Sequence, residues 1–302
     1  MRFSKFIFGM FVSSGLIGCG SEVVDNSQAP VGDRDLIRIM HDARTAHYNE
    51  NDIVALMATY SEEATVLTGT LQVASGKDAI RDQIGTEMAE SQELSNELKE
   101  TLLFDDQAVL WGEYSWSGTT SGETSGPYML ELGKIDNSWK VTREMWSHDR
   151  NPGEGLTWDV IPEDFDGNTE WSDEMNVLED LYNRGNSAAL AELFSEDALV
   201  GMPNFAVLEG RENVGAFFQS VLGESSETVM DISVRSANLL DEENVMLVGY
   251  MKIDGAEEVI ARGRARFMVL LELANPFEVD AGEDAEWHVR WMVASGKELF
   301  SA

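Results

Sequence analysis

The chain carries one pattern twice, first as Tyr48-Asn49-Glu50-Asn51-Asp52 followed by Tyr60-Ser61-Glu62-Glu63-Ala64. The second occurrence reads Tyr182-Asn183-Arg184-Gly185-Asn186 followed by Phe194-Ser195-Glu196-Asp197-Ala198. Both parts are offset by 134 positions (182 − 48 and 194 − 60), so no residue is inserted or deleted between them. A gap-free repeat of this length indicates two copies of one domain, and the long period indicates that each copy forms its own core.

The composition is that of a globular protein and excludes some partners. The 302 residues are 43% hydrophobic and include eight Trp, which suits two buried cores. The net charge of −34 disfavours binding to nucleic acid or to anionic lipid head groups, because both need a basic surface. We expect the acidic residues to keep the surface soluble. The sequence shows no nucleotide-binding loop, calcium-binding loop or Ser-His-Asp pattern, so no cofactor is predicted.

The first residues resemble a bacterial lipoprotein signal. Arg2 and Lys5 precede an apolar run, residues 6–17, that is too short to span a bilayer comfortably. Cys19, the sole cysteine of the chain, follows directly. In such signals the peptide is cut before the cysteine, whose thiol then carries the lipid. The alternative is an ordinary secretory signal with a chance cysteine.

This resemblance implies a signal peptide at 1–18, lipidation of Cys19 and a flexible tether at 19–33. Lipid chains anchor a protein through burial of their methylene groups, so the chain is expected at a membrane of the bacterial cell envelope. Gly20 follows the cysteine where inner-membrane lipoproteins carry aspartate. That difference favours the outer membrane, with the protein facing the periplasm.

In both copies the predicted helices precede the strands. Segments with apolar residues at helical spacing come first, and segments rich in aromatic and β-branched residues follow. In the first copy we predict helices at 35–49, 52–60 and 76–91, and strands at 64–67, 100–104, 109–117, 127–132 and 139–147. In the second we predict helices at 171–183, 187–194 and 211–222, and strands at 198–202, 228–237, 245–253, 260–273 and 286–294. The domains are predicted at 34–150 and 170–302, with a Pro-, Gly- and acid-rich linker at 151–169.

The motifs of both copies resemble those of the NTF2-like superfamily, in its SnoaL-like and DUF4440 groups. The quoted repeat marks a junction of helix and strand, and further motifs open the third helix and the last strand. These motifs are Gly76-Lys77-Asp78-Ala79-Ile80, Gly210-Arg211-Glu212, Trp139-Lys140-Val141 and Trp287-His288-Val289. The resemblance implies an α+β fold of two tandem cone domains, each with three N-terminal helices packed on a strongly curved antiparallel sheet. It also implies a pocket between the first helix and the concave sheet.

The superfamily contains enzymes as well as non-catalytic binding and association domains, so the fold alone assigns no activity. Ketosteroid isomerase uses an aspartate base and a tyrosine hydrogen-bond donor. By the resemblance, the position of the aspartate base is occupied by Thr68 in the first copy and by Met202 in the second. The position of the tyrosine is occupied by Arg44 and Leu178. None of these residues can take those roles, so steroid-isomerase chemistry is not expected in either copy.

The two copies differ on the helix face that is predicted to line the pocket. The arc holds ionisable residues in the first copy and apolar residues in the second. Its residues are His41, Arg44, His47 and Tyr48 in the first copy and Met175, Leu178, Leu181 and Tyr182 in the second. A charged or polar side chain buried without a partner costs several kcal/mol. The first copy therefore has either a polar pocket or buried polar pairs.

Two interpretations of that face stay open. In the functional one, Arg44 binds a polar or anionic ligand, or His41 and His47 act as an acid–base pair. In the structural one, Arg44 forms an ion pair with Glu144 or Asp42. A metal site is not predicted, because His41 and His47 are six positions apart rather than the four that suit one metal ion on a helix.

The strands add aromatic candidates, among which Trp111 and Trp146 are predicted to line the pocket, although packing in the core is the alternative. The predicted ligand-binding residues of the first copy are His41, Arg44, His47, Tyr48, Thr68, Trp111 and Trp146.

We therefore predict a lipid-anchored envelope protein whose first copy binds a small polar or anionic organic molecule. One alternative is a lyase, isomerase or hydrolase that uses His41 or His47. The other is a non-catalytic adaptor between proteins. The resemblance also implies pairing, because domains of this family commonly pair through their sheets. We therefore expect the two copies to form a pseudo-dimer, or the chain to form a homo-oligomer.

Overall fold

The computed structural model describes residues 32–67, 73–118, 122–147, 171–203, 205–224, 228–254, 263–274 and 286–297. The described residues from Asp33 onward form one compact unit. The predicted signal peptide, Cys19, nearly all of the tether and the linker at 151–169 lie outside the described residues. No helix in the described ranges has both the length and the apolar character needed to cross a membrane.

The first copy consists of the predicted helices and strands in the predicted order, with one additional short strand, Val73–Ser75, before the third helix. Its elements are α1 (Asp33–Asn49), α2 (Ile53–Ala58), β1 (Tyr60–Leu67), β2 (Val73–Ser75), α3 (Lys77–Glu90), β3 (Ser91–Leu103), β4 (Gln107–Gly118), β5 (Gly122–Ile135) and β6 (Ser138–Trp146). The second copy repeats this plan. Its elements are α4 (Ser172–Asn183), α5 (Ser187–Glu192), β7 (Phe194–Gly201), β8 (Leu208–Glu209), α6 (Arg211–Glu224), β9 (Val229–Leu239), β10 (Asn244–Asp254), β11 (Gly263–Leu273) and β12 (Trp287–Lys297).

The short second helix of each copy begins at an equivalent cap. The Asp52 carboxylate accepts a hydrogen bond from the backbone N–H of Ala55, at 3.0 Å, and satisfies a donor that the helix itself leaves free. In the second copy Asn186, 134 positions later, accepts from Ala189 at 3.2 Å. Repetition of the cap explains why this part of the repeat is so visible in the sequence.

The expected helix through Tyr60 is wrong in its last residues. Helix α2 ends at Ala58, because the backbone N–H of Thr59 donates back to Leu56 and Tyr60 already pairs with Val141 of β6. Strand β1 therefore begins four residues before its predicted start at Ala64.

Both sheets have six strands in the same order, β2-β1-β6-β5-β4-β3 and β8-β7-β12-β11-β10-β9. Two tandem α+β domains are thus confirmed, with one difference from the expected antiparallel sheet. Strand β1 runs parallel to β6, and β7 runs parallel to β12, so both sheets are mixed. The reason is topological: α3 carries the chain to the far edge of the sheet, and the four-stranded meander then returns beside β1 in the same direction.

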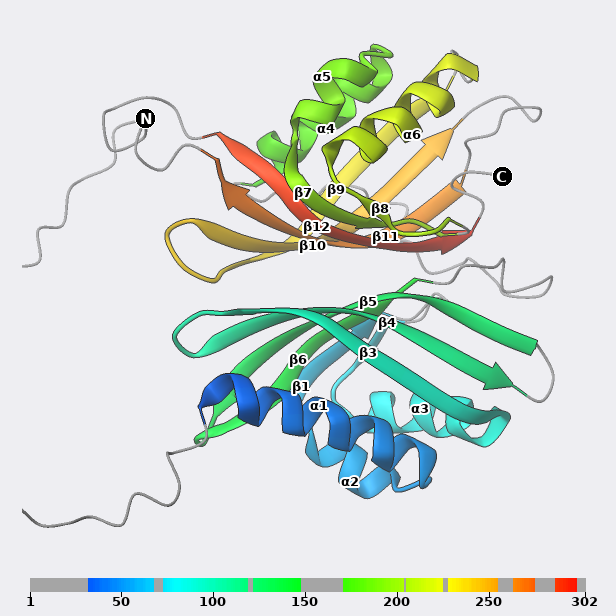
Figure 1. Cartoon of the computed structure of the whole chain (residues 1–302), viewed down its shortest axis with the longest axis vertical. Helices are drawn as coiled ribbons and strands as arrows, with labels where there is room; N and C mark the ends of the chain where they lie inside the picture. The colour runs from blue at the N-terminus through cyan, green and yellow to red at the C-terminus, as the bar shows by residue number, and fades with distance from the viewer. Residues whose placement is uncertain are drawn as a thin grey trace, which may run out of the picture. The chain divides into compact units, whose positions relative to one another are not determined.

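Helices α1, α2 and α3 lie over one face of the first sheet, and α4, α5 and α6 lie over one face of the second (Figure 1). Because side chains alternate between the two faces of a strand, every second residue points toward the helices. In β4 these are Ala108, Leu110 and Tyr114, which belong to the core of the first copy. The helix-facing side of each sheet is therefore where a pocket can form.

The other faces of both sheets contribute to one hydrophobic cluster. It contains Val109, Trp111 and Met129 from the first copy and Met268 and Leu270 from the second, among others. The rings of Trp111 and Trp291 have centroids 6.2 Å apart. These side chains lie opposite to the helix-covered faces, so they do not contribute to a pocket between helices and sheet.

Candidate functional site

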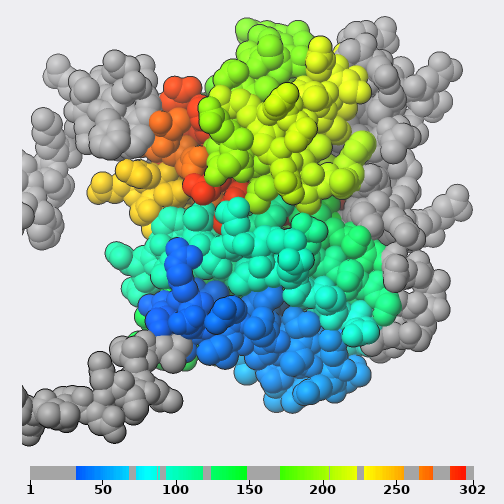
Figure 2. Space-filling view, in the orientation of Figure 1, coloured from blue at the N-terminus to red at the C-terminus, as the bar shows by residue number. Residues whose placement is uncertain are grey.

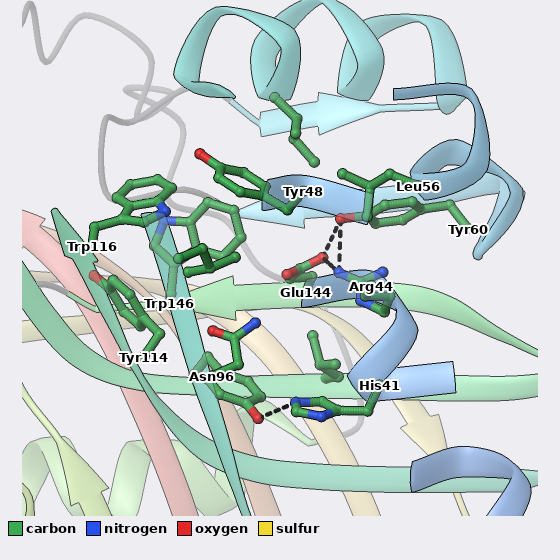
Figure 3. Close-up of a pocket in the computed structure, with 14 residues that line it drawn as sticks. His41, Arg44, Tyr48, Leu56, Tyr60, Asn96, Tyr114, Trp116, Glu144 and Trp146 are labelled. Atoms are coloured by element: carbon green, nitrogen blue, oxygen red, sulfur yellow. Dashed lines mark hydrogen bonds and ion pairs between the residues drawn. The ribbon is translucent and has the colours of Figure 1, made fainter. Parts of the chain in front are cut away.

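A small cavity lies between the helices and the sheet of the first copy, lined by residues of α1, α2, α3, β1 and β3–β6 (Figure 3). The space open to the centre of a water-sized sphere is about 50 Å³. One ordered water needs about 10–15 Å³ by that measure, so the cavity has room for a few waters or one small organic molecule. On the face seen in Figure 2, the side chains of α1 (blue) and β3 (teal) meet without a wide opening between them.

One side of the cavity is formed by an ion pair between α1 and β6. The Nη2 of Arg44 donates to Oε2 of Glu144 at 2.7 Å, and both side chains are 8% exposed. The hydroxyl of Tyr60 donates to the same oxygen at 2.5 Å and accepts from Arg44 at 3.0 Å. The Nη1 of Arg44 also donates to the hydroxyl of Thr59 at 3.0 Å. The guanidinium is therefore held by three partners before any ligand binds.

This cluster changes the titration of its members. Burial alone would lower the pKa of Arg44, but the charge of Glu144 and the contacts with Tyr60 outweigh it, so that pKa lies above its ordinary value. Burial, with the nearby Glu144 charge, raises the pKa of Tyr60 well above its usual value despite the opposing effect of Arg44. Arg44 thus stays charged and Tyr60 stays neutral at any physiological pH.

A second polar pair joins α1 to β5. The Nε2 of His41 lies 2.6 Å from the hydroxyl of Tyr128, and Nδ1 lies 3.3 Å from Oδ1 of Asp42. An ionised carboxylate only accepts hydrogen bonds, so the contact with Asp42 assigns the ring proton to Nδ1. The Nε2 atom of the neutral ring is then an acceptor, and Tyr128 donates to it.

Burial keeps His41 neutral. It lowers the pKa of His41, and the positive charge of Arg44 adds to the effect, while the hydrogen bond to Asp42 opposes it. Burial likewise raises the pKa of Tyr128 far above its ordinary value. His41 and Tyr128 therefore line the cavity as a neutral imidazole and a neutral phenol.

Glycine makes room for Tyr128. Gly112 lies directly opposite Tyr128 in the β4–β5 ladder, and a Cβ atom at residue 112 would lie 2.2 Å from the tyrosine hydroxyl. In the second copy Gly249 lies opposite Phe267, where a Cβ atom would lie 2.4 Å from the ring. Both copies thus use one glycine to seat an aromatic ring, and only the first copy adds a hydroxyl.

Aromatic rings form the other side of the cavity. Figure 3 shows Tyr48, Tyr114, Trp116 and Trp146 gathered at one end, away from His41. The centroid of Trp116 is 6.1 Å from that of Tyr48, 5.8 Å from that of Tyr114 and 5.9 Å from that of Trp146. The cavity therefore joins a polar end to a continuous aromatic wall.

The structure brings together some of the predicted residues and separates others. His41, Arg44, Tyr48 and Trp146 line the cavity. Thr68 lies outside the described residues.

Two predicted residues, His47 and Trp111, do not line the cavity. At ~100° per residue, His47 lies ~90° from the centre of the arc that Ile37, His41, Arg44 and Tyr48 form on α1, so it is only partly buried. Trp111 has the opposite parity to Tyr114 on β4 and packs in the cluster of the other face. His41 and His47 are therefore not an acid–base pair of one cavity.

The polar lining residues that were not predicted as site residues include Tyr60, Asn96, Tyr128 and Glu144. Glu144 was expected only as a structural partner of Arg44, and that ion pair is present. The sequence signal for Tyr60 is its replacement by Phe194 at the constant offset of 134. The signals for Tyr128 and Glu144 need the strand registers, which align them with Phe267 and Met292.

The second copy fills the equivalent space with hydrocarbon. Equivalent positions of the polar residues all carry buried apolar side chains in its core: Met175, Leu178, Phe194, Phe267 and Met292. Met202, which occupies the position equivalent to the isomerase base, is buried in the same core. The polar network is thus a property of the first copy among the residues that the structure describes.

No group of three His, Cys, Asp or Glu side chains in the described ranges is arranged to hold a metal ion. The polar groups that line the cavity are a carboxylate, phenols, an imidazole, a guanidinium, an amide and indoles, and aromatic rings supply apolar contact.

No protein-family model matches the chain, and no curated protein matches it. Solved structures do match. The chain is similar to a ketosteroid isomerase-like protein from Erwinia carotovora atroseptica SCRI1043, with 21% identity over 37% of this chain and 93% of that one and a TM-score of 0.35. It is similar to an NTF-2 like protein of unknown function from Shewanella oneidensis MR-1, with 22% identity over 38% and 98% and a TM-score of 0.34.

A third similar structure is an NTF2-like protein with a cystatin-like fold from Novosphingobium aromaticivorans. It shares 17% identity over 38% of this chain and 81% of that one, with a TM-score of 0.34. Each of the three similarities covers well under half of this chain.

Proposed function

We propose that the first copy is a binding domain for one small polar organic molecule and that the second copy is a structural partner with a filled core. The observation that carries the proposal is the difference between the two interiors. One copy keeps a cavity with buried polar side chains, and the other has hydrocarbon at the equivalent positions. A buried ion pair is often no more stabilising than hydrocarbon of the same volume, so stability alone does not account for this network.

The pairing of Arg44 narrows the predicted ligand. A free buried arginine would suit an anion, but the charge of Arg44 is already balanced by Glu144 at 2.7 Å. An anionic ligand would bring a second negative charge close to that carboxylate, and like charges at short range repel strongly in a poorly solvated site. Of the two classes predicted from the sequence, a polar ligand without negative charge is therefore favoured over an anion.

The proposal is tested by native mass spectrometry of the mature chain with Cys19→Ser. A small molecule of defined mass should stay bound to the purified protein. Asn96 lines the cavity, so Asn96→Phe should fill it and remove the bound mass. The neighbouring side chain Ser95 is exposed, and Ser95→Phe is the control that should keep it. Equal retention by both variants would contradict the proposed site.

We further propose that Cys19 carries a lipid that anchors the chain at the outer membrane, facing the periplasm. The support is the position of the sole cysteine after a short apolar run. Membrane fractionation should recover the full chain with the outer membrane, and Cys19→Ser should release it or retain the uncut signal. Normal membrane recovery of a fully processed Cys19→Ser chain would exclude the anchor.

A further inference from the structure

The polar atoms that the first-copy cavity leaves available include several hydrogen-bond acceptors. Glu144 uses only Oε2 for its contacts with Arg44 and Tyr60. None of the described residues donates to Oε1, and Figure 3 shows this second oxygen turned away from Arg44 and toward the aromatic side. A carboxylate oxygen is an obligate acceptor while it is ionised.

Tyr128 presents a second acceptor. Its proton is donated to Nε2 of His41, because the proton of that ring is on Nδ1 and faces Asp42. The lone pairs of the phenolic oxygen then remain for a ligand. Asn96 also lines the cavity and uses its amide nitrogen for the hydroxyl of Thr45 at 3.3 Å, which leaves its carbonyl oxygen as a third acceptor.

Charges of both signs surround the polar end of the cavity. The guanidinium of Arg44 has the largest charge effect on the Tyr128 hydroxyl, and the carboxylates of Glu144, Asp42 and Glu97 oppose it. The chain as a whole carries a net charge of −34, which raises the local concentration of cations and lowers that of anions. The ordinary cost of bringing a cation beside Arg44 is reduced because Glu144 lies between that guanidinium and the aromatic side in Figure 3.

The aromatic wall adds a second feature suited to a cation. The faces of Trp and Tyr rings carry partial negative charge and attract an ammonium group, more strongly where water is excluded. Trp116, Trp146, Tyr48 and Tyr114 supply such rings next to the acceptor oxygens. A polar end rich in acceptors, next to Trp and Tyr rings, is complementary to a group that carries positive charge and only donates hydrogen bonds.

We infer that the ligand of the first copy is a small organic ammonium compound, whose N–H groups donate to Glu144 and Tyr128 and whose carbon part lies against Trp116 and Trp146. This inference rests on the proposed function and names the chemical class of its ligand. An ammonium group has three donors and no acceptor, which fits oxygens whose own protons are absent or already donated.

The test compares three probes with one ring and one variable group: benzylamine, benzyl alcohol and phenylacetate. Each is titrated calorimetrically into the full chain, purified in detergent, at pH 7. We expect benzylamine to bind at least about tenfold more tightly than benzyl alcohol, since a charge-assisted hydrogen bond is about twice as strong as a neutral one. Phenylacetate should bind most weakly of the three.

Two variants locate the binding. Tyr128→Phe removes one acceptor without changing any charge, and it should weaken benzylamine about three- to tenfold. Glu144→Gln removes the carboxylate and should abolish the preference for benzylamine over benzyl alcohol. The control is Glu113→Gln, the same change at an exposed residue of β4 outside the cavity lining, which should keep the preference. If Glu144→Gln fails to fold, Tyr128→Phe alone decides between binding in and outside the cavity.

The outcomes separate the inference from the proposal on which it rests. Benzyl alcohol or phenylacetate could bind more tightly than benzylamine at a site that Asn96→Phe blocks. That result would support the proposed binding function and overturn the ammonium assignment. An affinity for benzylamine that Tyr128→Phe leaves unchanged would also overturn the assignment. Binding of none of the three probes overturns the ammonium assignment. If the native protein also retains no small molecule, the proposed function is overturned as well.

Discussion

The two copies share one backbone plan and have opposite interiors. Equivalent residues follow from the constant offset in the helices and from the strand registers. The polar residues of the first copy and their apolar counterparts in the second are Arg44 and Leu178, Tyr60 and Phe194, Glu144 and Met292, His41 and Met175, and Tyr128 and Phe267. Every partner of the network changes together, so no polar group of this set is left alone in the second copy.

The comparison shows that the fold does not need the network. The second copy builds the same strand order and the same helix caps on hydrocarbon. A buried charge without its partner would be costly, which explains why the residues differ as whole groups rather than singly. The network in the first copy is therefore more readily explained by binding than by folding, and variants that move one copy toward the other test this explanation.

The largest effect is expected when the ion pair is broken from one side. Glu144→Met leaves the guanidinium of Arg44 buried without its counter-charge and should lower the free energy of unfolding by about 3–5 kcal/mol. The triple variant Arg44→Leu, Tyr60→Phe, Glu144→Met carries the residues of the second copy at these positions. Its free energy of unfolding should be within about 1 kcal/mol of that of the parent, or higher. Urea unfolding, followed by circular dichroism, measures both.

The control for that experiment is an exposed ion pair of the same copy. Arg81 and Asp78 lie 2.6 Å apart on α3, with side chains 45% and 94% exposed, and Arg81→Ala should change stability by less than about 1 kcal/mol. A triple variant as unstable as Glu144→Met would contradict the comparison, because it would show that the first copy needs the network to fold.

A smaller effect is expected at the second polar pair. His41→Met leaves the buried hydroxyl of Tyr128 without its acceptor, which should cost about 1–3 kcal/mol. Adding Tyr128→Phe removes the unsatisfied hydroxyl and should recover most of that loss, since the double variant has the residues of the second copy. Thermal unfolding of the two variants decides the matter: if the double variant is the less stable one, the two residues are not equivalent to Met175 and Phe267 in packing.

The same pair predicts a pH dependence. The pKa of His41 is lowered in the folded chain by burial, so below about 6.5 the unfolded chain takes up the proton before the folded chain does. The free energy of unfolding should therefore fall as pH falls from about 6.5 toward the lower pKa of the folded state. In His41→Met/Tyr128→Phe this part of the fall should be absent. Parallel curves for parent and double variant between pH 7 and pH 5 would show that His41 is not buried as described.

Much of the fold was predictable because its signals are local. The caps at Asp52 and Asn186, and the glycines with positive φ at Gly76 and Gly210, recur at one offset and set the ends of the helices. The parallel pairing of β1 with β6 was not predictable in this way. It joins residues about 80 positions apart, such as Val66 and Glu144, and depends on the path of the whole meander.

The candidate site was predictable on α1 and not on the strands. On the helix the two copies align without gaps, so the change from Leu178 to Arg44 is visible in the sequence alone. Along the strands the offset grows to 139 for Tyr128 and 148 for Glu144 (267 − 128 and 292 − 144), because the second copy has longer connections. The prediction about Trp111 was wrong although alternation along β4 separates it from Tyr114, a signal that the strand pattern already contained.

The smallest effect on stability is expected from a glycine in the third helix of each copy, α3 and α6. In α3 a Cβ atom at Gly85 would meet nothing within 4 Å, so Gly85→Ala should stabilise the chain by about 0.5–1 kcal/mol through the lower entropy of the unfolded state. In α6 a Cβ atom at Gly215 would lie 3.0 Å from the Cβ of Ala191 on α5. Gly215→Ala should therefore gain less or lose stability, because tight packing there opposes the same entropic gain. Equal stabilisation by both substitutions, measured by thermal unfolding, would show that the helices of the second copy are not packed more closely at this point than those of the first.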